Sequence, residues 1–305
     1  MSAGFFVTAP HRIALQGYRY FNPEWLGRLP NVQWGGPAMT IKFLAALACS
    51  AAALAQPALA AGDLLVAPTR IVLESGRGTE VILNNVGNAP ATYRISLELR
   101  RMDAEGQLDT VVVGTETEKE KATLAMVSYA PRRVTLPPNQ PQVIRVGARI
   151  SPDLPDGEYR AHMLFRAVPE AASVTDAPQT GLTIALTPIY GVTIPVIVRK
   201  GALQATATIA DVHLSREGGE MALAFRLTRG GDRSVYGRLR VTRPGTAKPI
   251  YEARGLAVYA ELSQRTVLLP LSREVAVAMT GPVVVQYVED NDTGGLIAEA
   301  KVDLR

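Results

Sequence analysis

The sequence has little cysteine and little histidine, and this shortage excludes several kinds of chemistry. Only one of its 305 residues is cysteine (Cys49) and three are histidine. His162 and His213 each lie within an alternating, strand-like pattern, without a nucleophile elbow or an HExxH pair nearby. A Ser-His-Asp triad or a zinc site therefore has no support, and a solvated or hydrogen-bonded histidine is favoured for both positions.

Motifs for binding phosphate and calcium are also missing. No GxGxxG and no P-loop follows any run that reads as a strand. Asp290-Asn291-Asp292 resembles a fragment of a calcium loop, but no glutamate completes the twelve-residue spacing, so we interpret it as a turn. We expect no cofactor, no metal and no enzymatic activity.

The segment that starts at Met39 has the features of a secretory signal peptide. Basic Lys42 precedes an apolar run from Phe43 to Ala55, and Ala58-Leu59-Ala60 follows as a cleavage site. A membrane span is the alternative, but the run is shorter than the roughly 20 residues that a bilayer requires. We therefore predict a signal peptide over 39–60, cut after Ala60 or Ala61.

Residues 1–38 lie upstream of this complete signal, and we interpret them as a mis-assigned start or, alternatively, as a real N-terminal extension. Because Cys49 falls inside the apolar run, the exported chain would contain no cysteine. Disulfides, thiol catalysis and cysteine-ligated zinc are then excluded together.

The apparent basicity belongs mostly to the segment that would be removed. Residues 1–60 hold four basic residues and one acidic residue, so Lys plus Arg falls from 32 to 28 and Asp plus Glu from 28 to 27. The net charge drops from +4 to +1. This leaves no basic footprint for nucleic acid, and we expect a periplasmic chain that does not insert into the membrane.

From residue 61 onward, strand-length alternating runs recur every 8–12 residues with turn signals between them, which is typical of β-sandwiches. Glu116 to Lys121 is predicted to be a solvated loop, and Pro169 to Gln179 a mobile loop. Before residue 200 the runs are 64–73, 79–83, 91–101, 107–113, 129–136, 143–150, 157–168 and 181–199. After it they are 203–214, 221–227, 236–241, 249–258, 266–269, 283–288 and 296–302.

These runs predict an all-β chain with two sandwiches in tandem, one over 61–200 and one over 201–305. The longest run, Gly181 to Arg199, has apolar residues on one parity and small or hydroxylated residues on the other. At about 3.3 Å per residue it would extend about 60 Å, far beyond an ordinary strand. Two interpretations are open: a core strand that leads into a linker, or a strand that offers part of itself to a partner.

One basic residue, Arg70, stands in the middle of the first run, directly after Pro68-Thr69. It is either an arginine on the solvated face of an edge strand or an arginine in a cleft. In a cleft, its planar guanidinium could bind a carboxylate through two parallel hydrogen bonds.

Four segments, taken in order, resemble the periplasmic chaperones of pilus and fimbria assembly, the PapD-like family. The resemblance covers Leu64 to about Gly201, and the second sandwich is compatible with it. The segments are Thr69-Arg70 in the opening strand, Ala130 to Pro138 followed by Val143-Ile144-Arg145, Leu154 to Arg160 running into Phe165 to Pro169, and the final strand ending Ile194 to Arg199.

The resemblance implies two tandem immunoglobulin-like β-sandwich domains and no enzymatic activity. It also implies that the long final strand of the first domain completes an unfinished pilus subunit, with backbone hydrogen bonds supplying affinity. The matching donor residues are Leu182, Ile184 and Leu186. Arg70 matches the arginine that holds the subunit's C-terminal carboxylate.

The chain departs from the family pattern at two positions. The family's second anchor, a lysine on the final strand, corresponds to Gly191 or Val192, and no lysine stands between Gly181 and Arg199. Glu158 matches a glutamate that the family uses between its domains, but the usual arginine partner is replaced by Ile194. We expect Glu158 to be structural.

Two hypotheses follow for the function. The first is a chaperone that is a monomer or a weak self-capping dimer, binds pilus or fimbrial subunits and delivers them to an outer-membrane usher. The second is a structural or adhesive β-sandwich protein of the cell surface. After Ala61 there is no alternating hydrophobic N-terminal extension of the kind that a pilus subunit needs.

Overall fold

A computed structural model describes residues 64–74, 78–169, 189–217, 219–290 and 295–305. All of them belong to one compact unit, Leu59–Arg305. The predicted signal peptide at 39–60, the upstream residues 1–38 and the donor residues Leu182, Ile184 and Leu186 lie outside the described residues.

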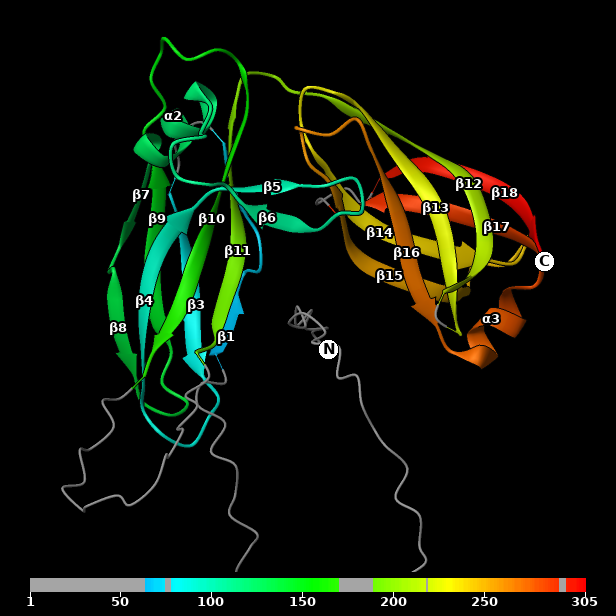
Figure 1. Ribbon diagram of the computed structural model, residues 1–305, viewed down its shortest axis with the longest axis horizontal. Helices are drawn as coiled ribbons and strands as arrows, with labels where there is room; N and C mark the ends of the chain where they lie inside the picture. The colour runs from blue at the N-terminus through cyan, green and yellow to red at the C-terminus, as the bar shows by residue number, and fades with distance from the viewer. Residues whose placement is uncertain (1–63, 75–77, 170–188, 218, 291–294) are drawn as a thin grey trace, which may run out of the picture. The chain divides into compact units, whose positions relative to one another are not determined.

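The first part of the described chain forms two sheets that pack face to face (Figure 1). One has the order β1 (Leu64–Ala67), β3 (Thr79–Asn85), β9 (Gln142–Ala148), β7 (Val127–Ala130). The other has the order β2 (Ile71–Glu74), β11 (Gly191–Lys200), β10 (Gly157–Val168), β4 (Ala91–Glu98), β8 (Arg133–Leu136). A small hairpin, β5 (Arg100–Met102) and β6 (Leu108–Thr110), follows β4.

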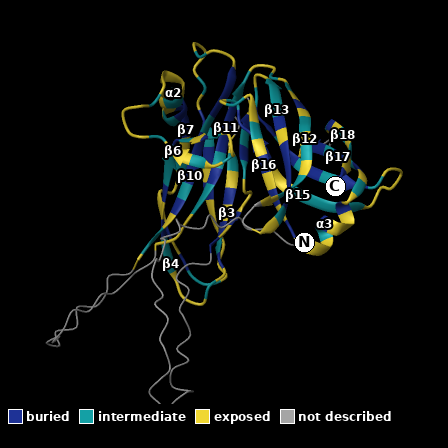
Figure 2. Ribbon diagram, turned by 45° about the vertical axis from the view of Figure 1, so that its right-hand side comes forward, coloured by how far each residue is buried: buried dark blue, intermediate teal, exposed yellow. Residues whose placement is uncertain are grey.

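Alternation along the strands produces the core between these two sheets. In β3, Val81 and Leu83 are fully buried while the residues beside them are not, and Ile144 of β9 lies in the same layer. Met163 and Phe165 of β10 fill the core from the opposite sheet. Figure 2 shows this layer as dark bands that alternate with exposed residues along the strands. Each such side chain contributes about 1.5–3 kcal/mol when it leaves water.

The second part forms another sandwich with its own core. One sheet has the order β12 (Ala205–Glu217), β13 (Glu220–Gly231), β16 (Gln264–Leu271). The other has the order β15 (Pro249–Val258), β14 (Val235–Thr242), β17 (Gly281–Glu289), β18 (Leu296–Leu304). The predicted all-β fold with two tandem immunoglobulin-like sandwiches is confirmed.

The structure differs from the sequence prediction at several places. The run at 64–73 is divided between the two sheets, because the chain leaves β1 at Pro68 and enters β2 at Ile71. The run at 129–136 is divided in the same way, between β7 and β8. The expected loop over Glu116 to Lys121 is wrong from Glu118 onward, where helix α2 (Glu118–Met126) begins. A second short helix, α3 (Arg273–Met279), was not predicted.

Helix α2 has a local cause. The Thr117 side chain accepts a hydrogen bond from the Glu120 backbone N–H, and the Glu120 carboxylate accepts one from the Thr117 N–H. This capping box satisfies two backbone donors that would otherwise lack partners at the helix start.

Candidate functional site

Strand β11 of the five-stranded sheet lies between β2 and β10, but β2 covers only about half of its outer side. On its inner side, pairing with β10 extends from Gly191 to Lys200. On its outer side, β2 pairs in parallel with Val196 to Arg199 only. No described strand pairs with Gly191 to Pro195 on that side. Unpaired N–H and C=O groups at a sheet edge form a template for adding a strand.

The side chains of β11 show which face an added strand would share. Ile194, Val196 and Val198 are buried in the core of the first sandwich, and Val192 packs against it. The donor residues predicted at 182, 184 and 186 have the same parity in the sequence, but they stay a prediction because they lie outside the described residues.

Arg70 lies beside the end of this open edge. It directly precedes β2, whose first residue, Ile71, pairs with Val196. Its guanidinium carbon lies 4.5 Å from the ring centroid of Tyr236, on the second sandwich. Arg70 is half-buried, and its Nε is enclosed without a hydrogen-bond partner among the described residues. Burial, and then the positive charge of Arg199, lower the pKa of Arg70.

Arg70 therefore presents a partly desolvated cation with hydrogen-bond donors to spare. An arginine stays charged in proteins, and a carboxylate is the acceptor that fits its fork of N–H groups. Of the two interpretations from sequence, a fully solvated arginine does not match this contact with Tyr236. Carboxylate binding by Arg70 remains a prediction.

Glu158 links the two sandwiches at a position close to Arg70. Its side chain is 1% exposed. One carboxylate oxygen accepts a hydrogen bond from Arg199 Nε at 3.1 Å, and the other accepts one from the Ser234 backbone N–H at 3.2 Å. Arg199 also lies 3.5 Å from the exposed Glu74. Glu158 thus has an arginine partner on the final strand, five residues beyond Ile194.

A second polar network joins the sandwiches through Arg160. Its guanidinium pairs with Glu261, donates to the Arg100 carbonyl at 3.0 Å and stacks 3.8 Å from the Tyr259 ring centroid. Glu261 also accepts the backbone N–H of Met102, from the β5–β6 hairpin, at 3.0 Å. The contacts of Arg160 and Glu158 place side chains of β10 against the second sandwich.

The two described histidines differ in their burial. His162 is 1% exposed, with Nε2 3.2 Å from Arg160 Nη1 and its ring edge-on to Tyr259. Burial, with help from Arg160 and Arg100, lowers the pKa of His162 to about 3, so the ring is neutral at pH 7. His213 is exposed on β12.

The described residues offer neither a metal site nor a membrane-spanning helix. No cluster of three or more His, Cys, Asp or Glu side chains there is placed to hold a metal. Of the helices in this part of the chain, none has the length and apolar character needed to cross a bilayer.

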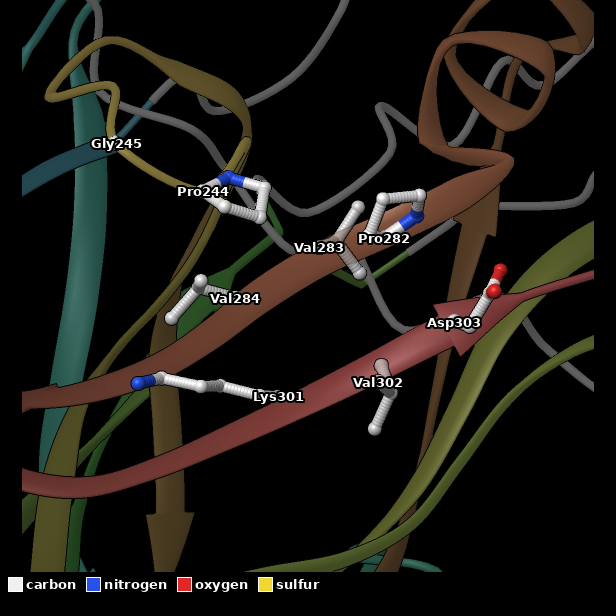
Figure 3. Close-up of a pocket in the computed structure, with 8 residues that line it drawn as sticks. All are labelled: Pro244, Gly245, Pro282, Val283, Val284, Lys301, Val302 and Asp303. Carbon is white, nitrogen blue, oxygen red and sulfur yellow. The ribbon is translucent and has the colours of Figure 1, made fainter.

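A shallow pocket lies on the second sandwich, away from all predicted site residues. It has a volume of about 370 Å³ and is lined by the β14–β15 turn and by β17 and β18 (Figure 3). Lys301 and Asp303 are its charged residues. Neither is near the open edge of β11 in the sheet order, so the pocket does not belong to this site.

The sequence singled out Arg70 and Glu158, which stay predictions as site residues, but it did not point to Tyr236, Arg199 or Glu261. Tyr236 and Glu261 reach the site only because the second sandwich packs there, and no local pattern signals this. Arg199 is the penultimate residue of β11 and lies opposite Glu158 in the antiparallel pair with β10, a register that the sequence alone does not give.

Comparisons with known proteins gave structural likenesses only. No family model and no curated protein matches the sequence. The structure is similar to the YadV chaperone (16% identity, TM-score 0.41, covering 79% of this chain and 98% of that one) and to the E. coli chaperone DraB (15%, 0.42, 80% and 98%). It is also similar to a chain of the Salmonella enterica SafA pilin in complex with the SafB chaperone (18%, 0.41, 80% and 97%). At such identities and TM-scores the function has to be argued from the site itself.

Proposed function

We propose that this chain is a periplasmic chaperone that binds pilus or fimbrial subunits by donating a strand. The observation that carries the proposal is the outer edge of β11, which is unpaired from Gly191 to Pro195 among the described residues. A subunit strand that adds to this edge would gain backbone hydrogen bonds along it.

The segment before β11 supplies the apolar contacts in this proposal. Leu182, Ile184 and Leu186 alternate with small or hydroxylated residues. They would fill the groove of a subunit that lacks its own last strand. Each buried side chain contributes about 1.5–3 kcal/mol before ordering costs.

Arg70 gives the bound strand a fixed end. A C-terminal carboxylate beside Arg70 would pair with a guanidinium that has already lost much of its hydration and stacks on Tyr236. Charge-assisted, bidentate hydrogen bonds are about twice as strong as neutral ones. Arg199 adds positive charge near Arg70, although its own guanidinium is bonded to Glu158. Delivery of the subunit to an outer-membrane usher completes the proposal.

The test is co-expression with the candidate subunit encoded nearby, followed by affinity purification of the complex. Ile184→Asp places a charge among the donor residues, and Arg70→Ala removes the anchor. We expect each change to reduce recovery of the complex at least tenfold, which corresponds to about 1.4 kcal/mol or more. Circular dichroism should show that both variants stay folded.

Two matched variants control for general damage. Thr183→Asp adds the same charge one residue away, on the opposite parity, and Arg149→Ala removes an exposed arginine elsewhere on the first sandwich. Both should bind as the wild type does. Undiminished recovery with Ile184→Asp and Arg70→Ala would overturn the chaperone mechanism, and self-association into fibres would favour the structural or adhesive alternative.

A further inference from the structure

Three arginines lie side by side across three neighbouring strands of the first sandwich. Arg94 of β4 pairs directly with Arg133 of β8 on one side and with Arg166 of β10 on the other. Residues directly opposite each other in antiparallel strands point to the same face, and all three are exposed. We call Arg133, Arg94 and Arg166 the arginine row.

The arginine row has no counter-charge in the described part of the chain. None of its members makes an ion pair or hydrogen bond with a described side chain. The residues next to them on the same face carry no charge: they are Thr92, Ser96, Thr135, Leu164 and Val168. Glu98, further along β4, is paired with Arg100.

This arrangement is unfavourable for the isolated chain. Like charges directly opposite each other on neighbouring strands destabilise a sheet, and Arg94 is repelled from both sides. An anionic partner would turn this repulsion into three charge-assisted contacts, which is the main physical argument that the row binds something.

The row ends beside the open edge of β11. Arg166 pairs with Gly191, the first residue of β11, where no described strand covers the outer side. Gly191 has no side chain to separate Arg166 from a strand added at that edge, and a Cβ there would lie 3.1 Å from Leu164 Cδ1. Neighbouring strands are about 4.8 Å apart, so an added strand would lie two strands from Arg166.

We propose that the arginine row binds an acidic segment of the subunit that docks on β11. The segment would continue from the added strand and cross the sheet face, with its carboxylates over Arg166, Arg94 and Arg133 in turn. This inference rests on the proposed function and adds the chemistry of the partner: carboxylate side chains next to the strand that pairs with Gly191 to Pro195.

A labelled deca-glutamate peptide tests the row apart from the donor segment. The exported chain is titrated into the peptide, and binding is followed by fluorescence anisotropy at several salt concentrations. We expect Arg94→Glu to weaken binding at least tenfold and to flatten its dependence on salt. Arg149→Glu makes the same charge change at an exposed site outside the row and should shift the affinity less than twofold.

The thermal midpoint of Arg94→Glu shows whether a loss of peptide binding comes from the changed charge or from unfolding. A glutamate at position 94 would stand between two guanidinium groups as an opposite-charge pair with each. The thermal midpoint of Arg94→Glu should therefore rise while peptide binding falls, which a folding defect would not produce. If the thermal midpoint of Arg94→Glu falls instead, peptide binding is measured with Arg94→Gln, which removes the positive charge without adding a negative one. Undiminished binding by Arg94→Gln would overturn the proposal.

Two further results would also overturn it. One is an equal loss of binding in Arg94→Glu and Arg149→Glu. The other is binding of the row to phosphatidylglycerol vesicles without binding of the glutamate peptide, which would mark a membrane surface as its partner. Failure of the row in these tests leaves the donor-strand test with Ile184→Asp unaffected.

Discussion

His162 shows how the contact between the sandwiches sets the charge of one side chain. Its ring is enclosed between Arg160 and Tyr259. Protonation would bury a charge next to a guanidinium, so the pKa of His162 falls to about 3. In the unfolded chain the imidazole has an ordinary pKa of about 6.5.

Acid should therefore weaken the fold through His162. Between pH 6.5 and 3 the unfolded state binds one proton more than the folded state, so stability is present above pH 6.5 and is lost as the pH falls below it. We expect the free energy of unfolding to drop by about 1.4 kcal/mol more between pH 7.5 and 5.5 in the wild type than in His162→Gln. Urea unfolding at the two pH values measures this, and equal losses in the two proteins would contradict it.

The single residues that could be read from the sequence are those fixed by local pattern. Arg70 was noticeable because a charged residue interrupts an alternating run. Pro68-Thr69, directly before it, placed it in the middle of the first predicted strand. Tyr236 could not be found in this way, since its contact with Arg70 depends on how the second sandwich packs against the first. The arginine row could not be predicted from the sequence either, because its three residues become neighbours only through the pairing register of three strands.

At the scale of elements, alternation identified most strands because each sheet has one buried face. It failed where the chain changes sheet or forms a short helix. The run around Pro68 keeps its alternation although its halves belong to different sheets. Helix α2 has only Thr123 and Met126 buried, too few for a helical period, although Thr117-x-x-Glu120 is a capping-box signature in the sequence.

The cap of α2 should be measurable by itself. Thr117→Ala removes the acceptor for the Glu120 backbone N–H and should lower the free energy of unfolding by about 1 kcal/mol in urea titrations. Thr117→Ser keeps the hydroxyl and should recover most of that loss. Similar stability of the alanine and serine variants would show that the capping box does not support the helix.

The contribution of helix α2 to stability also depends on pH, through Glu120. A hydrogen bond from Arg101 holds the pKa of Glu120 at about 2, below its usual 4.5. Because the folded-state pKa is lowered, this contribution is present above pH 4.5 and is lost as the pH falls toward 2. It therefore acts at a lower pH than the contribution of His162.

At the scale of the whole molecule, the two sandwiches share buried polar contacts as well as apolar ones. Ile197 of the first sandwich packs with Ala257 and Tyr259 of the second. Glu158 bonds Arg199 within the first and the Ser234 N–H in the second. Removing one member of such a buried pair leaves the others without partners, which costs more than the pair contributes as a whole.

Glu158 should therefore couple the unfolding of the two sandwiches. Glu158→Ala leaves the Ser234 N–H without its acceptor and leaves Arg199 with only the exposed Glu74, 3.5 Å away. We expect a loss of about 3 kcal/mol and, in calorimetry, two thermal transitions in place of one. Glu158→Gln keeps an acceptor for Ser234 and should preserve more of the coupling. Glu74→Ala removes an exposed partner of the same arginine and should cost less than about 1 kcal/mol, so equal losses in Glu158→Ala and Glu74→Ala would contradict a coupling role for Glu158.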